Sequence, residues 1–183
     1  MAWPSRKPPK EHFHGSPKKQ ALLLDMVRVL RQNHAMEHAT INVLLKQLSR
    51  KVRLLGYTSL AGFYIVGDIS TETLEQSARE ALRQLQEGKK EIAISPMCGT
   101  NLVVTGLVAG AASMIAGRGH SGWSRFQRMA TASMIGAILA QPLGLLAQKH
   151  ITTDAGQADV TSLRVTRRGG GMLTWHKVEI LRS

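Results

Sequence analysis

Two histidines and a glutamate form the part of this sequence best suited to chemistry. In "HAMEH", His34 and His38 are four positions apart, and Glu37 directly precedes His38. On a helix this spacing puts both imidazoles on one face, where they could share a metal ion. Zinc accepts such nitrogens at about 2.0–2.1 Å, and a nearby carboxylate can take a proton from a water molecule that the zinc polarises. We therefore predict His34 and His38 as zinc ligands and Glu37 as a catalytic base.

The same three groups have two other interpretations. They could form a metal-free, hydrogen-bonded cluster inside the protein, or they could contact an organic cofactor or a partner. Burying three such groups without partners would cost on the order of several kcal/mol, so something must satisfy them. The sequence alone leaves these alternatives open beside zinc.

A zinc site also needs a third protein ligand. Cys98 is the first candidate, because a thiolate binds zinc and "PMCGTN" stands at the start of an apolar segment. The alternative is that Cys98 is simply a small buried apolar residue, as most single cysteines are. The other candidates are Glu72, Glu75, Glu80, His150 and His176.

The order H-x-x-E-H reverses the commoner H-E-x-x-H metallopeptidase motif. "HAMEH" resembles the active-site helix of the inverzincin, or pitrilysin-type, zinc metallopeptidases, and "FYIVGDISTETLEQ" resembles their strand–turn–helix passage around a Gly-Asp pair. The resemblance implies that His34 and His38 bind zinc and that Glu37 is the general base. The chain is too short for that family's two-half architecture, and the family's third ligand, a downstream glutamate, cannot be assigned.

Over its whole length the chain is similar to a different group. The order of "HAMEHATINVL", "GFYIVGDIS", "CGTNLVVTGL" and a short basic tail resembles an uncharacterised bacterial membrane-protein family, a domain of unknown function. That resemblance implies the architecture but no activity.

A long helix must position the histidines. It is predicted to start at Ser16 or Pro17, an N-cap followed by a proline at the first helical position, and to run to about Leu55, with Gly56 as its stop. Apolar residues recur every three or four positions and predict one buried row that includes both histidines. The row is Leu23, Val27, Leu30, His34, His38, Ile41, Leu45, Leu48, Val52 and Leu55.

The remaining soluble elements predict a small α+β domain. A strand is expected over 63–69, a helix from Ser70 or Thr71 to Gly88, and a short strand over 91–95. The tail, 149–183, predicts a β-hairpin that turns at Gly169 to Gly171 between Leu163, Val165 and Leu173, Trp175, and that joins the earlier part, 18–96. Residues 1–17 are basic and proline-rich, which predicts a disordered arm.

Two uncharged runs, 97–117 and 129–148, interrupt this domain. Because about 20 apolar residues cross a bilayer, they predict a transmembrane helical hairpin over 97–148. Gly106 and Gly110 are four apart and favour close helix packing or self-association. The distribution of basic residues favours the inner (cytoplasmic) membrane with both termini in the cytoplasm. The alternative is a pair of helices buried in a soluble core.

Charge and composition narrow the function. The net charge of +12 suggests nucleic acid or an anionic membrane as neighbour, but aromatic residues are only 4% of the chain and no base-reading motif is present. We therefore expect the lipid bilayer, and other membrane subunits, as partners rather than specific nucleic acid. Two functions stand side by side: a membrane-anchored, peptidase-like zinc hydrolase, and a non-catalytic accessory or assembly subunit of a membrane complex. Nucleic-acid binding is a third, carried by charge alone.

Overall fold

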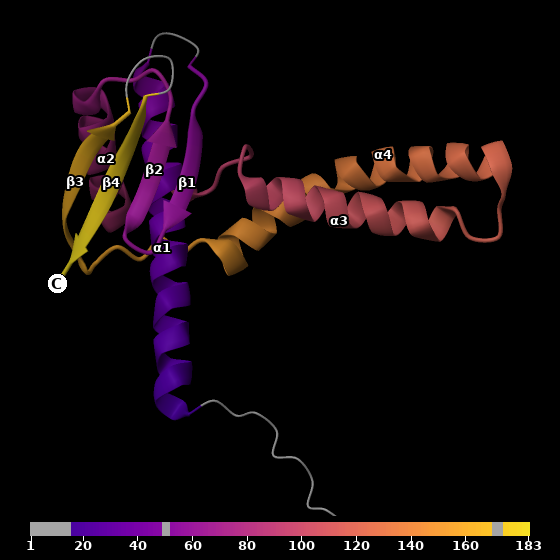
Figure 1. The fold of residues 1–183 in the computed structure, drawn as a ribbon, viewed down its shortest axis with the longest axis horizontal. Helices are drawn as coiled ribbons and strands as arrows, with labels where there is room; N and C mark the ends of the chain where they lie inside the picture. The colour runs from indigo at the N-terminus through magenta and orange to yellow at the C-terminus, as the bar shows by residue number, and fades with distance from the viewer. Residues whose placement is uncertain (1–15, 49–51, 170–173) are drawn as a thin grey trace, which may run out of the picture.

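The computed structural model describes residues 16–48, 52–169 and 174–183. An α/β domain carries a long hairpin of two helices that projects away from it (Figure 1). The elements are α1 (Pro17–Gln47), β1 (Leu55–Ser59), β2 (Gly62–Val66), α2 (Thr71–Gln86), the 3₁₀ turn η1 (Lys90–Ala93), α3 (Gly99–Ala116), α4 (Gly122–Ala147), the π-helical turn η2 (Gln148–Thr152), β3 (Val160–Arg168) and β4 (Trp175–Arg182).

Four antiparallel strands form the sheet in the order β1-β2-β4-β3. The predicted C-terminal hairpin is confirmed as β3–β4, and β4 pairs with β2, so the tail completes the domain begun before the helical hairpin. Gly169 has a φ of 78° at the start of the turn, while Gly170, Gly171 and Leu173 lie outside the described residues. The predicted arm falls almost entirely on residues 1–15, which also lie outside them.

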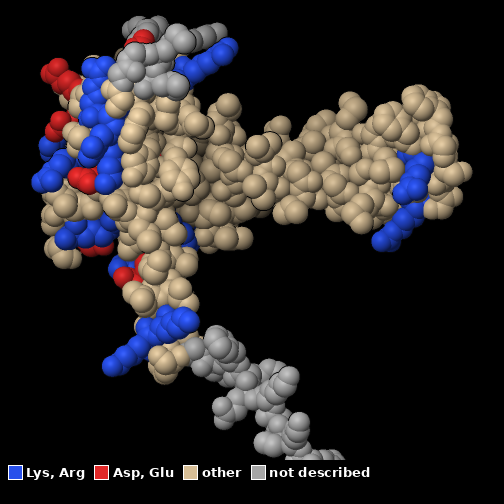
Figure 2. Space-filling model, in the orientation of Figure 1, with Lys and Arg blue, Asp and Glu red and all other residues tan. Residues whose placement is uncertain are grey.

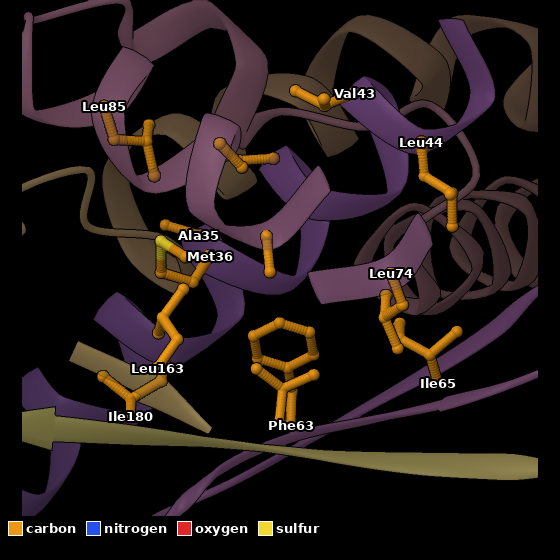
Figure 3. Close-up of a cluster of buried hydrophobic side chains, with 14 of the residues drawn as sticks. Ala35, Met36, Val43, Leu44, Phe63, Ile65, Leu74, Leu85, Leu163 and Ile180 are labelled. Atoms are coloured by element: carbon orange, nitrogen blue, oxygen red, sulfur yellow. The ribbon is translucent and has the colours of Figure 1, made fainter. Parts of the chain in front are cut away.

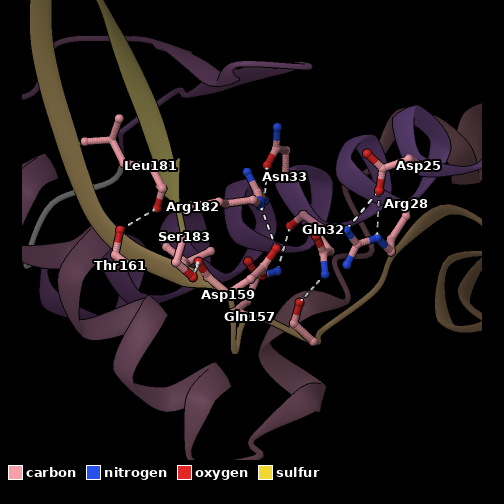
Figure 4. Close-up of polar contacts among 12 residues, drawn as sticks. Asp25, Arg28, Gln32, Asn33, Gln157, Asp159, Thr161, Leu181, Arg182 and Ser183 are labelled. Atoms are coloured by element: carbon pink, nitrogen blue, oxygen red, sulfur yellow. Dashed lines mark hydrogen bonds and ion pairs between the residues drawn. The ribbon is translucent and has the colours of Figure 1, made fainter. Parts of the chain in front are cut away.

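The core lies between the sheet and the helices α1 and α2. Phe63 and Ile65 of β2 pack with Met36 of α1 and Leu74 of α2 in a cluster with no solvent exposure at these four residues (Figure 3). Polar contacts also hold α1. Arg182 Nη2 donates to Asn33 Oδ1 at 2.6 Å, and Figure 4 shows this pair with the polar residues around it. The middle of α1 is therefore fixed in the domain.

The prediction for the end of the first helix is wrong. α1 ends at Gln47 rather than near Leu55, and residues 55–59 form the edge strand β1, with Gly56 inside it. Pairing of Tyr57 and Thr58 with Tyr64 and Phe63 of β2 accounts for the difference, because sheet pairing overrides the helical spacing of a short apolar run.

The predicted buried row of α1 is also wrong at its N-terminal end. Leu23 and Val27 are 51% and 52% exposed, whereas the core takes an adjacent face. The residues of that face are Ala35, Met36, Ala39, Val43 and Leu44. α1 has two apolar arcs, and spacing alone does not tell which arc meets the sheet. Most of the predicted row, though not Leu23 or Leu48, borders a cavity instead.

The predicted strand at 91–95 is replaced by η1. The carbonyl oxygens of residues 91–95 accept hydrogen bonds from α1 rather than from a neighbouring strand. Asn42 Nδ2 donates to Ile92 O at 2.8 Å and to Ile94 O at 3.2 Å. The strand predicted over 63–69 is shorter, ending at Val66. The helix after it is confirmed, with Ser70 Oγ accepting from the Thr73 amide at 3.0 Å.

The two uncharged runs form the helical hairpin α3–α4. Both helices are long and apolar enough to cross a membrane, and on the hairpin Figure 2 shows charged side chains only near its far end. α4 starts at Gly122, and the rings of Trp123 and Phe126 stack in its first turns. No residue of α3 is buried. A Cβ on Gly136 would lie 3.1 Å from Ala109 Cα, so the helices touch there, while Gly106 and Gly110 face open space.

Candidate metal centre

His34, His38 and Cys98 meet where the helical hairpin leaves the domain. His34 Nε2 lies 3.3 Å from Cys98 Sγ, and the two imidazole centroids are 4.3 Å apart with an interplanar angle of 60°. One ligand atom from each of the three residues lies within 4.8 Å of the others. Cys98 is the N-cap of α3 and accepts from the Thr100 amide at 3.3 Å. The folded chain therefore brings together three groups of the types that bind zinc.

Backbone carbonyls orient both rings. His34 Nδ1 lies 3.0 Å from Thr152 O, and His38 Nδ1 lies 2.8 Å from Ala93 O. In a neutral ring, the nitrogen that faces a carbonyl oxygen carries the proton, so Nε2 offers a lone pair to a metal; in a protonated ring, Nε2 can instead donate to the sulfur of Cys98. The hydrogen bond to the carbonyl oxygen is the outer one that fixes metal-binding imidazoles in proteins. η1 and η2 supply these carbonyls, and the sequence offered no signal for either.

The spacing suits a tetrahedral zinc site. Zinc–sulfur and zinc–nitrogen bonds of about 2.3 and 2.1 Å at a tetrahedral angle put sulfur and nitrogen about 3.6 Å apart. The observed 3.3 Å between His34 and Cys98 is close to that separation. Three protein ligands leave a fourth position open, as in catalytic rather than structural zinc sites.

Glu37 lies beside this group without belonging to it. Its carboxylate is 7% exposed and accepts a short hydrogen bond from the Thr58 hydroxyl of β1. A Cβ at Gly56 would collide with Glu37 Oε1, so the glycine leaves the space that the carboxylate occupies. The edge strand β1, which the sequence reasoning missed, therefore holds the predicted base. The available signal was Tyr57 and Thr58, residue types that are common in strands.

The cluster shifts the pKa of its own members. Burial raises the pKa of Cys98, but hydrogen bonds from His34, His38 and Thr100 outweigh it and lower the pKa to about 5. Burial raises the pKa of Glu37 above its usual range, although Thr58 and the two histidines oppose this. Burial lowers the pKa of His34, but its contacts with Cys98 and the Thr152 carbonyl outweigh it, and the net pKa is raised. The thiolate is the form of cysteine that binds metals.

A cavity of about 1000 Å³ opens over the cluster. Its walls come from α1, β1 and the segment that leads into α3, and His34, Glu37, His38 and Cys98 all border it. Much of the rest of the lining is apolar. The apolar side chains are Val27, Leu30, Ile41, Leu45, Val52, Leu54, Leu55, Pro96, Met97 and Ile151.

The other candidates for the third ligand lie elsewhere in the described part of the chain. Glu75 and Glu80 pair with Arg79 and Arg83 on the outer side of α2. His176 is buried in the sheet, with Nε2 3.1 Å from the Thr71 hydroxyl. Glu72 and His150 are exposed and stand outside the group. Cys98 is thus the candidate that the fold brings to the histidines.

Comparisons with known proteins agree with part of the expected resemblance. An uncharacterized protein of Picosynechococcus sp. is 34% identical over 137 residues, which are 68% of this chain and 65% of that protein, so the match spans about two thirds of that relative's length. No solved structure matches. The resemblance to zinc metallopeptidases stays a prediction. Residues 29–167, which include the two histidines, Glu37 and Cys98, match a family described as "Domain of unknown function (DUF6391)", and the chain belongs to that family.

Proposed function

We propose that this protein is an integral membrane protein that binds zinc through His34, His38 and Cys98 and uses Glu37 in a metal-dependent, peptidase-like hydrolysis. The convergence of both imidazoles on the Cys98 thiol, with His34 Nε2 3.3 Å from its sulfur and the carboxylate of Glu37 beside them, is the observation that carries this proposal. The carbonyl oxygens behind both rings support the proposal, because such hydrogen bonds orient metal-binding imidazoles in proteins.

The membrane part of the proposal rests on the hairpin. α3 and α4 present apolar side chains outward over most of their length, such as Leu107 and Ile138, and no charged residue stands in 99–117 or 129–148. In water this surface would be costly, whereas hydrocarbon covers it without cost. The distribution of lysine and arginine favours the inner membrane with both termini in the cytoplasm.

The residues around the cavity suit hydrolysis. A zinc ion, when bound, supplies Lewis-acid polarisation of a water molecule or a carbonyl group. Glu37 would accept the proton of the attacking water and pass it to the leaving amine, and its burial favours the proton-accepting role near neutral pH. Thr58 and Gly56 hold the carboxylate in place. The Thr152 and Ala93 carbonyls hold the imidazoles.

Metal content tests the ligand set. The full chain, purified in detergent, should contain zinc at a stoichiometry near one, measured by inductively coupled plasma mass spectrometry. His38→Ala and Cys98→Ala should lose most of it. His150→Ala is the matched control, because His150 is exposed and lies outside the cluster, and should keep it. Wild-type protein without stoichiometric metal would contradict the proposal.

Glu37→Gln separates binding from chemistry. The variant should keep its zinc, because Glu37 is not among the three ligand residues, and should lose hydrolysis of internally quenched peptides by a factor of about 10²–10⁴. A Glu37→Gln protein as active as wild type would exclude the carboxylate as the base.

A second function, accessory or assembly subunit of a membrane complex, is favoured by a separate observation. Gly106 and Gly110 face open space on α3, and small residues at this spacing let another membrane helix approach closely. On this proposal the chain would purify in a stoichiometric complex, and His34→Ala would disturb assembly rather than catalysis. A protein that is always found alone and monomeric would argue against it.

A further inference from the structure

The N-terminal half of α1 extends beyond the domain and exposes an apolar surface. In Figure 1 this part of the helix projects past the sheet and past α2. Its large apolar side chains are exposed to solvent. They are Leu22, Leu23, Leu24, Met26, Val27 and Leu30. The domain core begins only near Gln32, so packing within the chain does not explain these residues.

The exposed surface is one-sided. At 100° per residue, Leu22, Leu23, Met26, Val27 and Leu30 fall on one arc of α1, whereas Asp25 and Arg28 fall on another, and Leu24 lies between Val27 and Arg28. Asp25 Oδ1 and Arg28 Nη2 form an ion pair of 2.9 Å on that second arc (Figure 4). The segment is therefore amphipathic, with a polar side and an apolar side.

The apolar side is the one that borders the cavity. Val27 and Leu30 line the cavity together with His34 and His38. Around the same opening, further large apolar side chains are exposed. They are Leu55 and Tyr57 of β1, Met97 before α3 and Ile151 of η2. The apolar surface of α1 is thus continuous with the base of the helical hairpin.

Hydrogen bonds fix α1 to that base. Arg31 Nη2 donates to His150 O at 3.2 Å and to Thr153 O at 3.1 Å, and His34 Nδ1 contacts Thr152 O. α1 runs across the direction of the hairpin rather than along it (Figure 1). If the hairpin crosses a bilayer, α1 lies along its surface.

We propose that residues 17–30 of α1 form an interfacial helix, with Leu23 and Val27 in the headgroup layer of the bilayer that α3 and α4 span. The partner is an anionic membrane surface, because Lys18 and Lys19 stand in the first turn of the exposed segment and the chain has a net charge of +12. The cavity over His34, His38 and Cys98 then opens toward the headgroups. This inference rests on the membrane insertion proposed above but not on metal binding or catalysis.

Spin-label depth measurements in nanodiscs test it. The full chain carries Cys98→Ser, a conservative N-cap replacement, and single cysteines at exposed positions: Leu23→Cys, Val27→Cys, Asp25→Cys, Arg28→Cys and, in the hairpin, Leu107→Cys. The discs contain phosphatidylcholine and phosphatidylglycerol and hold one protein each. The readout is the ratio of collisions with oxygen, which concentrates in lipid, to collisions with a water-soluble nickel chelate.

The expected pattern follows the helix period. Positions 23 and 27 should show a ratio several-fold higher than positions 25 and 28, and position 107 should be deepest. A deep label at 107 with all four α1 labels in water would overturn the interfacial helix and leave the membrane hairpin intact. A label at 107 in water would overturn the hairpin insertion and this inference with it. If the labels at 23 and 27 collided with neither oxygen nor the nickel chelate, protein would cover them, and that result would also overturn the interfacial helix.

The second measurement leaves Cys98 unchanged. Leu23→Trp and Arg28→Trp, made in an otherwise unchanged chain, are compared for quenching by brominated phosphatidylcholine. Leu23→Trp should add strongly quenched emission to the wild-type signal, and Arg28→Trp should not. Equal quenching of the two added tryptophans would contradict a one-sided helix.

Discussion

The α/β domain and the helical hairpin distribute their apolar residues in opposite ways. In the domain, Phe63, Ile65 and Leu74 are fully buried, and among the described residues the charged side chains other than that of Glu37 are half-buried or exposed. In the hairpin, α3 has no buried residue, and α4 buries only Gly136, Ala140 and Gly144. Large side chains of the hairpin, such as Leu107 and Ile138, point outward.

The difference teaches what holds each region together. The domain has the arrangement of a protein folded by removal of apolar surface from water. The hairpin has the arrangement in which small residues let two backbones approach and the surroundings cover the rest. The candidate metal centre lies at the junction, with His34 and His38 from the domain and Cys98 from the hairpin.

The largest effect expected from this contrast is in the core. Phe63→Ala should destabilise the protein by about 3–5 kcal/mol, because it removes a fully buried ring and leaves a cavity. Leu107→Ala in α3 should change the unfolding free energy by no more than about 0.5 kcal/mol, because the side chain makes little contact within the chain. Chemical denaturation of both variants in detergent micelles measures the difference. Equal losses would mean that the hairpin packs against something as the core does.

Most of the fold followed from sequence patterns that depend on local physics. Ser70 as an N-cap, the β-hairpin around Gly169 and the two uncharged runs were each predicted, and each depends on neighbours in the sequence. The incorrect predictions concern segments whose structure depends on contacts with residues far away in the sequence. Residues 55–59 form a strand because β2 pairs with them. Residues 91–95 do not, because their carbonyl oxygens accept hydrogen bonds from side chains of α1.

The candidate site divides in the same way. The spacing of His34 and His38 predicted that both rings share a face, and the chemistry of thiolates made Cys98 the first choice for a third ligand. The backbone oxygens of Ala93 and Thr152, which orient the rings, have no side-chain signature. Which apolar arc of α1 meets the core depends on tertiary packing, so the spacing could not decide it.

The second-largest expected effect concerns the junction between the α/β domain and the helical hairpin. Gln148 is fully buried, and its amide donates to Ser95 O at 2.9 Å and to Asn101 Oδ1 at 2.8 Å, while its oxygen accepts from the Ser95 amide at 2.9 Å. Gln148→Leu removes the hydrogen-bond partner of the Ser95 amide and of Asn101 Oδ1 and should cost about 1–3 kcal/mol. Calorimetry of detergent-solubilised protein measures the loss.

The junction variant should also weaken zinc binding, because Ser95 O accepts from the Cys98 amide as well, at 3.2 Å. Competition with a chromogenic chelator measures the affinity. Lys149→Leu, at the exposed neighbouring position, is the control and should leave both quantities near wild type. Undiminished stability in Gln148→Leu would show that the two regions are held together by something other than this network.

A smaller effect separates the two glycine positions of the hairpin. Gly136→Leu should destabilise the hairpin by about 1–2 kcal/mol, because its Cβ would already lie 3.1 Å from Ala109 Cα and the backbones must move apart. Gly106→Leu meets open space and should not weaken the isolated chain. Disulfide trapping between cysteines placed on α3 and α4 reports whether the helices separate. If Gly106→Leu instead lowers recovery of an oligomer, α3 contacts another subunit there.

The smallest effect is a pH dependence confined to the domain. His176 is buried in β4, and burial, with the nearby charge of Arg167, lowers its pKa, so the folded state favours the neutral ring. Because the unfolded chain has the higher pKa, about 6.5, it binds the proton more tightly, and stability is lost as pH falls through that value. His176→Gln should therefore lose less unfolding free energy than wild type between about pH 7.5 and about pH 5.5, by no more than about 1.4 kcal/mol per pH unit, even if its stability at neutral pH is lower. Thermal melts at a series of pH values compare it with His150→Gln, an exposed histidine that should leave the acid loss unchanged. If wild type and His176→Gln lost the same unfolding free energy at low pH, another group would cause the loss. That group would not be His34, because its pKa is raised and its protonation favours the folded state.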